Sequence, residues 1–111
     1  MSIEINSLEQ YEVIEGYKAR FVHSETMTMV FWEVDPGAAI PMHSHPHEQL
    51  SQVTEGEFEM IMNGKTLILK PGSVLKIPSN MQHGGKALTA CKITDIFNPV
   101  REDYKALSEE S

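Results

Sequence analysis

The chain has 111 residues and a formal net charge of −7, with 41% hydrophobic and 23% charged residues. These values are typical of one globular domain. No cluster of lysine and arginine is present that would neutralise nucleic-acid phosphates. The single cysteine, Cys91, fits a reducing cytoplasm. Since no stretch reaches the length of a membrane span and residues 1–10 lack a signal-peptide core, we expect a cytoplasmic protein without nucleic-acid or membrane partners.

Short β-rich segments separated by turns follow one another along the chain. The expected strands are 26–34, 49–56, 73–77 and 90–97, and residues 57–72 are expected to form a hairpin. Asn63 and Gly64 supply the two positive-φ residues of its tight turn. Residues 101–111 are expected as a short helical or frayed tail. This regular spacing of turns predicts an all-β barrel or sandwich in a single domain, residues 1–111.

Three of the five histidines lie in the stretch HSHPHEQ, residues 43–49. Residues two apart on a strand face the same side, so His43, His45 and Gln49 are expected on one face. With His83 from a second strand, they would offer three imidazoles and an amide oxygen to a transition metal. On spacing alone, a solvated loop with incidental metal affinity or a hydrogen-bonded core histidine explains the cluster equally well.

The spacing around these residues reads G-x5-H-x-H-x3-Q-x6-G from residue 37, and fifteen residues later G-x5-P-x4-H. This pair of motifs resembles that of the cupin superfamily. The resemblance implies a double-stranded β-helix, or jelly-roll barrel, with its core at about residues 26–98. It also implies that a divalent metal ion (Zn, Ni, Mn or Fe) is bound by His43, His45, Gln49 and His83. Asn80 departs from the family pattern, but asparagine accepts positive φ.

Gln49 stands where many cupins have glutamate. A neutral ligand leaves the metal's charge available for Lewis-acid chemistry, whereas oxygen-activating iron sites more often carry a carboxylate. Gln49 therefore favours a non-redox reaction. Glu48 is a rival ligand that faces the other way on a regular strand, although a bulge after Pro46 would reverse the assignment. His47 is expected at the rim of the site, with binding to metal or substrate as the alternative.

A second informative stretch is DIFNPVREDY, residues 95–104. Asp95 and Phe97 share a strand face, and Arg101 follows just beyond it. Without context, Asp95 could face water and Arg101 could pair with Glu102 or Asp103 on the surface. Together with HSHPHEQ, however, the stretch resembles the pectin-degradation (KdgF-like) cupins. This implies conversion of 4,5-unsaturated uronate monosaccharides into linear ketouronates, with Asp95, Phe97 and Arg101 in the active site.

The roles that fit this chemistry follow from the residue types. Asp95 would act as general acid/base, Arg101 would bind the carboxylate of an acidic sugar, and Phe97 would pack on the sugar ring. Two other functions stay open: a metal-dependent cupin dioxygenase, and a non-enzymatic module that binds a sugar or anion. We also expect a homodimer that pairs through N-terminal strands such as MVFW (residues 29–32), which is compatible with every one of these functions.

Overall fold

The structure of the chain is a computed structural model that describes residues 1–109. Its elements are η1 (Ile5–Ser7), β1 (Tyr11–Ile14), β2 (Tyr17–His23), β3 (Thr28–Val34), β4 (Ala39–His43), β5 (Glu48–Glu55), β6 (Phe58–Met62), β7 (Lys65–Leu69), β8 (Val74–Ile77), β9 (His83–Ala87), β10 (Cys91–Asn98) and α1 (Glu102–Glu109). The four predicted strands correspond to β3, β5, β8 and β10, and the predicted hairpin to β6 and β7. The predicted helical tail, residues 101–111, corresponds to α1. Residues 110–111 of that prediction lie outside the described residues.

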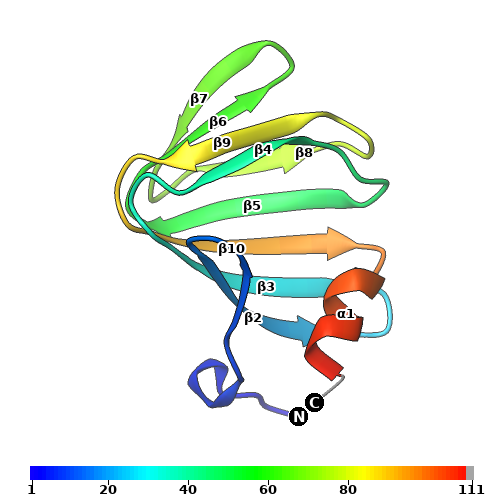
Figure 1. Ribbon diagram of the computed structural model, residues 1–111. Helices are drawn as coiled ribbons and strands as arrows, with labels where there is room; N and C mark the ends of the chain where they lie inside the picture. Colours follow the sequence, from blue (N-terminus) through cyan, green and yellow to red (C-terminus); the bar gives the residue numbers. More distant parts are fainter. Residues whose placement is uncertain (110–111) are drawn as a thin grey trace.

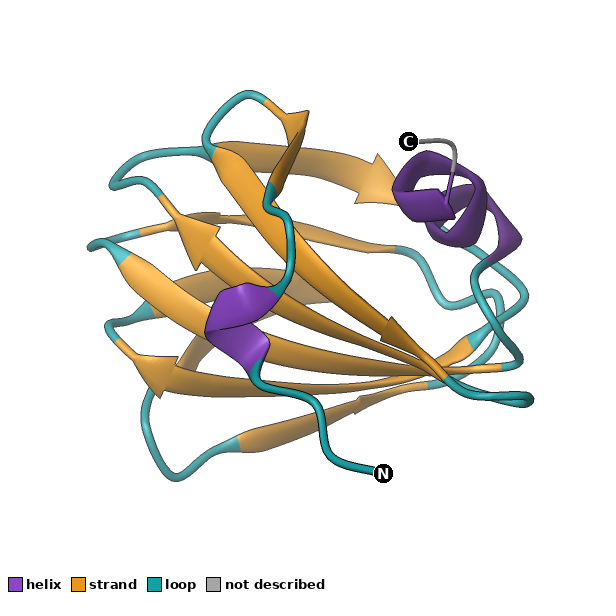
Figure 2. Cartoon of the chain, turned by 90° about the horizontal axis from the view of Figure 1, so that it is seen from below, coloured by secondary structure: helices purple, strands orange, loops and turns teal. Residues whose placement is uncertain are grey.

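The strands form two antiparallel sheets that face each other (Figure 1). One sheet has six strands in the order β1-β2-β3-β10-β5-β8, and the other has four in the order β4-β9-β6-β7. The chain crosses repeatedly between the sheets, since β4 and β5 are consecutive but lie in different ones. Seen from below, α1 sits at one end of the strands (Figure 2). The all-β prediction is confirmed.

The core forms where the inward faces of the two sheets meet. Buried and more exposed residues alternate along β3 and along β10, as expected for strands with one face in the interior. Val30 and Trp32 of β3 are buried, so half of the MVFW stretch lies in the chain's own core. Ile93 pairs with Trp32, and Asp95 pairs with Val30, across the β3–β10 ladder. The same alternation that builds the core therefore also points Asp95 inward.

Two turns depend on residues that tolerate left-handed backbone. Asn63 and Gly64 connect β6 to β7 with φ of 52° and 71°, which is the tight hairpin predicted from the sequence. Asn80 precedes β9 with φ of 64°. The asparagine that departs from the cupin pattern thus adopts the conformation for which glycine is usually selected. This turn delivers the chain to His83.

Four strands were not predicted: β1, β2, β4 and β9. The β9 sequence, HGGKA, has two glycines, which have low β propensity, and β4 contains Pro41. The pairing of β9 explains its composition. A Cβ atom on Gly85 would collide with the carbonyl oxygen of Glu59 on β6, and one on Gly84 would come within 2.9 Å of the Met42 nitrogen on β4. Glycine lets β9 lie between these two neighbours.

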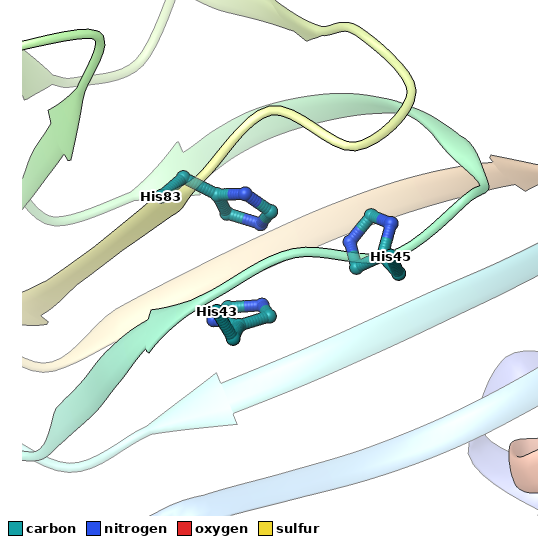
Figure 3. A group of neighbouring side chains, drawn as sticks. All are labelled: His43, His45 and His83. Atoms are coloured by element: carbon teal, nitrogen blue, oxygen red, sulfur yellow. The ribbon is translucent and has the colours of Figure 1, made fainter.

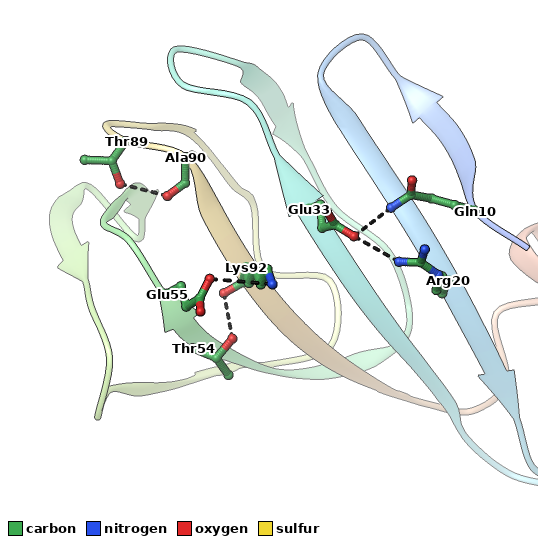
Figure 4. A network of polar contacts seen from close by, with 8 residues as sticks. All are labelled: Gln10, Arg20, Glu33, Thr54, Glu55, Thr89, Ala90 and Lys92. Atoms are coloured by element: carbon green, nitrogen blue, oxygen red, sulfur yellow. Dashed lines mark hydrogen bonds and ion pairs between the residues drawn. The ribbon is translucent and has the colours of Figure 1, made fainter. Parts of the chain in front are cut away.

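Polar side chains pair across the outer face of the six-stranded sheet (Figure 4). Arg20 on β2 contacts Glu33 on β3 at 2.9 Å, and Gln10 donates to the same carboxylate. Lys92 on β10 lies 3.7 Å from Glu55 on β5. Exposed pairs of this kind contribute about 0–1 kcal/mol each, so the interior provides most of the stability. Among the described residues, no helix has both the length and the apolar character needed to cross a membrane.

Candidate metal centre and its cavity

The histidine cluster is divided among several elements. His43 is the last residue of β4, His45 lies in the loop that follows, Gln49 is the second residue of β5, and His83 begins β9. The premise that His43, His45 and Gln49 share one strand face is therefore wrong, because β4 and β5 belong to different sheets. The loop between β4 and β5 brings these side chains together. The alternation of side chains along a strand does not explain their proximity.

A bulge in β4 aligns the two sheet histidines. Ile40 pairs with Gly85, and the next pair is His43 with His83, so three steps along β4 match two along β9. Such a bulge rotates the side chains that follow it. As a result, the rings of His43 and His83 lie 4.2 Å apart between centroids.

The three imidazoles present the same nitrogen to one another (Figure 3). The Nδ1 atoms of His43, His45 and His83 each lie 2.9–3.0 Å from a backbone carbonyl oxygen two residues away in sequence. A carbonyl only accepts, so each Nδ1 carries the proton and donates. Each Nε2 therefore keeps a lone pair that could bind a cation, which is the arrangement that second-shell hydrogen bonds impose on metal-binding histidines.

The ligand atoms of these three histidines all lie within 4.8 Å of one another. One ion at an ordinary nitrogen–metal distance of about 2.0–2.1 Å can contact all three after small side-chain adjustments. Burial lowers the pKa of His45 and of His83. The lower pKa favours the neutral form of both rings, which is the form that a metal requires.

Gln49 places a side-chain amide beside the three histidines. Its Oε1 atom lies 3.1 Å from Nε2 of His45, and both residues are buried. With Nδ1 of His45 protonated, these two atoms are both acceptors. They repel unless a cation lies between them or the amide turns its NH2 group toward the ring. Glu48 is exposed and points away, as the regular-strand alternative predicted.

His47 lies beside His45 but is not one of the three histidines whose ligand atoms converge. It is half-buried, its ring centroid lies 5.6 Å from that of His45 and 6.3 Å from that of Phe97, and its backbone carbonyl accepts the His45 hydrogen bond. Its Nδ1 atom is buried and has no hydrogen-bond partner among the described residues. The rim position predicted for His47 agrees with these contacts.

Asp95, on β10, is buried and lines the same cavity as the three histidines. Its Oδ2 accepts a 2.9 Å hydrogen bond from Nε1 of Trp32, whereas its buried Oδ1 has no hydrogen-bond partner of adequate geometry among the described residues. Burial raises the pKa of Asp95 and outweighs the opposing influence of the Ser51, Gln49 and Trp32 side chains. The water-exposed strand edge considered for Asp95 is therefore wrong.

Arg101 combines both of the arrangements considered for it. It does pair with Asp103, but its own side chain is only 12% exposed. Its Cζ atom lies 4.7 Å from the centroid of the Phe97 ring and 4.0 Å from that of Tyr104. Burial opposes the charge of Arg101, yet the Asp103 carboxylate outweighs this and raises the Arg101 pKa. The guanidinium is thus a permanent cation on two aromatic faces.

One cavity of about 60 Å³ gathers the predicted site residues. All seven line it: His43, His45, Gln49, His83, Asp95, Phe97 and Arg101. Trp32 and Tyr104 also line it and were not predicted. Tyr104 follows Arg101 by three residues, a spacing that places both on one side of a helix start, and this signal could have identified it. Nothing local to MVFW indicates that Trp32 reaches Asp95.

The comparisons with known proteins agree with this geometry. A family model described as the cupin domain matches residues 30–97. The pectin degradation protein KdgF of Dickeya dadantii (strain 3937) is 31% identical over 96 residues, 84% of this chain and 87% of that protein. The structure of KdgF from Halomonas sp. superposes with a TM-score of 0.88 at 27% identity, covering 94% of this chain and 99% of that one.

An RmlC-like cupin from Shewanella frigidimarina NCIMB 400 superposes with a TM-score of 0.86 at 30% identity, over 94% of each chain. The family match covers more than half of the sequence, and the relatives cover nearly all of it. The chain therefore belongs to the cupin family, as a small single-domain member that resembles KdgF.

Proposed function

We propose that the chain converts 4,5-unsaturated uronate monosaccharides from pectin or alginate into linear ketouronates, without a redox step. The similarity to KdgF, a protein named for pectin degradation, supports an acidic sugar as substrate. The observation that carries the proposal is the position of Asp95. Its carboxyl group has one oxygen held by Trp32 and one with no hydrogen-bond partner in the described part of the chain, in the cavity that Arg101 and the three histidines also line.

The substrate is a cyclic enol ether with a carboxylate on C5 of its C4=C5 double bond. Ring opening adds a proton to C4 and a water oxygen to C5, which gives a hemiketal at C5. The bond from C5 to the ring oxygen then breaks, C5 becomes a ketone, and the ring oxygen remains on C1 as a hydroxyl. C1 then carries two hydroxyls and loses water to give the aldehyde. The net change is an isomerisation.

The chain's own residues fit the requirements of this reaction. Arg101 offers N–H donors to the substrate carboxylate, so a local cation makes an anionic substrate compatible with a net charge of −7. Phe97 offers a ring face to the sugar. Asp95 gives a proton to C4 and accepts one from the attacking water. Burial of these groups excludes bulk water and strengthens each interaction.

The donor set of three imidazoles and one amide fits a divalent ion such as Zn, Ni, Mn or Fe. Bound by His43, His45, His83 and Gln49, such an ion supplies Lewis acidity. Gln49 brings no negative charge to the site.

The test is to follow loss of the conjugated-alkene absorbance of unsaturated galacturonate or mannuronate in the presence of each candidate metal. Asp95→Asn is expected to lower kcat by about 10²–10⁴-fold, the usual contribution of general acid–base catalysis. Asp35→Asn, an exposed change of the same kind, is the control and is expected to keep full activity. A wild-type rate equal to buffer with every metal would remove this function. Iron-dependent oxygen consumption would favour a dioxygenase instead.

A further inference from the structure

One edge of the Arg101 guanidinium is bonded to a neighbouring residue of the same chain. Nε of Arg101 donates to Oδ1 of Asp103 at 3.0 Å, and Nη2 donates to Oδ2 at 2.8 Å. These two parallel bonds form the side-on bidentate pair that guanidinium and carboxylate groups prefer. Arginine has five N–H donors. Asp103 therefore does not use Nη1 or the second proton of Nη2, although the Tyr104 side chain also interacts with the guanidinium.

Arg101 and Asp103 differ in how far their side chains are exposed to solvent. The Arg101 side chain is 12% exposed and lines the cavity, whereas that of Asp103 is 60% exposed. Asp103 thus holds the guanidinium from the solvent side. Phe97 and Tyr104 confine it through their ring faces, at 4.7 Å and 4.0 Å.

The base of the Arg101 side chain is also fixed. Its backbone N–H donates to Oγ1 of Thr28 at 3.0 Å, and Thr28 is completely buried. Its carbonyl accepts the Lys105 N–H at 2.9 Å, so α1 begins directly after Arg101. Asp103 is the second residue of that helix. The backbone and both rings are therefore in place, and the Asp103 carboxylate sets the remaining rotation of the guanidinium.

We propose that Asp103 is a positioning residue that orients Arg101 so that its Nη1–Nη2 edge receives the substrate carboxylate. The identity of that anion, an acidic sugar, rests on the proposed function. Holding the fork in one orientation lowers the entropy lost when the carboxylate binds. Charge alone predicts the opposite effect on binding. Asp103 neutralises Arg101, so removing the Asp103 carboxylate should make the site bind an anion more tightly. The sign of the effect on binding thus separates orientation from charge.

The kinetic experiment compares Asp103→Asn with Glu102→Gln, using the metal that supports turnover. Both variants remove one negative charge from the first turn of α1, but Glu102 is exposed and makes no hydrogen bond to Arg101 in the described part of the chain. Asp103→Asn is expected to raise KM about 10-fold, the value of one charge-assisted hydrogen bond, with kcat within about twofold. Glu102→Gln is expected to change neither. Asp103→Glu keeps the carboxylate and should recover part of the loss.

A spectroscopic measurement tests the orientation without turnover. The chain has two arginines, Arg20 and Arg101, so their ¹⁵Nε–H resonances are assigned with one Arg101→Lys variant. In the zinc-loaded protein, Asp103→Asn should shift the Arg101 resonance and speed its exchange with water. The Arg20 resonance should not move, because Nε of Arg20 donates to the Leu8 carbonyl instead.

Titration with D-galacturonate, a saturated acidic sugar, then gives Kd for each variant. If the wild type binds galacturonate more tightly than Asp103→Asn but turns over no unsaturated uronate, the proposed function fails and the role of Asp103 stands. Three results would overturn the role itself: tighter binding by Asp103→Asn, equal effects of Asp103→Asn and Glu102→Gln, or no binding of galacturonate by the wild type together with an unchanged Arg101 resonance.

Discussion

The hydrogen bond from Trp32 to Asp95 is expected to stabilise the fold measurably. Trp32 is 8% exposed and Asp95 is 7% exposed, and the bond between them is 2.9 Å long. Trp32→Phe removes the Nε1–H donor. Oδ1 of Asp95 already lacks a hydrogen-bond partner among residues 1–109, and the variant removes the Trp32 donor from Oδ2 as well. The loss of such a bond in a buried setting is about 1–3 kcal/mol, in addition to the packing lost with the indole.

A double-mutant cycle separates the bond from the packing. Asp95→Leu replaces the carboxyl group by an apolar group of similar size, and it is combined with Trp32→Phe. The loss of indole packing occurs in both backgrounds and cancels. The double variant is therefore expected to be about 1–3 kcal/mol more stable than the two single changes predict by addition.

Urea unfolding followed by far-ultraviolet circular dichroism measures this coupling. Trp32 is the only tryptophan in the sequence, so its fluorescence is lost in two of the four proteins. EDTA is present throughout, because a bound metal would add ligand-linked stability that differs among the variants. A coupling below about 0.3 kcal/mol, the limit of additivity for independent sites, would refute the role assigned to this bond.

The proposed metal ligands, a glycine of β9 and the buried thiol can each be tested separately. His83→Ala is expected to weaken Zn²⁺ binding by more than about 100-fold in calorimetry, and His47→Ala by less than about threefold; equal losses would contradict the ligand set. Gly85→Ala should lower the free energy of unfolding by about 1–3 kcal/mol or more, because its Cβ meets the Glu59 carbonyl, and an unchanged melting temperature would contradict that contact. Burial raises the pKa of Cys91, so its stabilising contribution is complete below about pH 8.5 and is lost as the pH rises toward the folded-state pKa. The unfolding free energy of Cys91→Ala should therefore fall less steeply between about pH 8 and 10, and parallel slopes would argue against this.

The sequence by itself determined the tight hairpin, several strands and the candidate site residues. The Asn63-Gly64 hairpin was predictable because few residue pairs adopt positive φ twice in succession. A strand such as β3 was predictable because it is rich in β-branched and aromatic residues. The paired cupin motifs also identified the residues that gather around the cavity. The hairpin and the strands depend on neighbours a few positions apart in the chain, whereas the paired motifs were informative because of their resemblance to the cupins.

The strands that were missed show where such reasoning fails. β9 is a strand despite two glycines, because close approach of β4 and β6 requires small residues there. The convergence of His43, His45 and Gln49 was expected for the wrong reason, since a bulge and a loop between two sheets bring them together. Tertiary pairing overrode local propensity in both cases.

Only the tertiary structure decided which distant groups complete the site. Trp32 and Asp95 are 63 residues apart in sequence, and their hydrogen bond exists because β3 and β10 are neighbours in the six-stranded sheet. Thr28 reaches the Arg101 backbone across 73 residues. Local pattern names the residue types that chemistry needs. Sheet order and burial determine which of those residues meet. They also determine which hydrogen-bond donors remain available to a substrate.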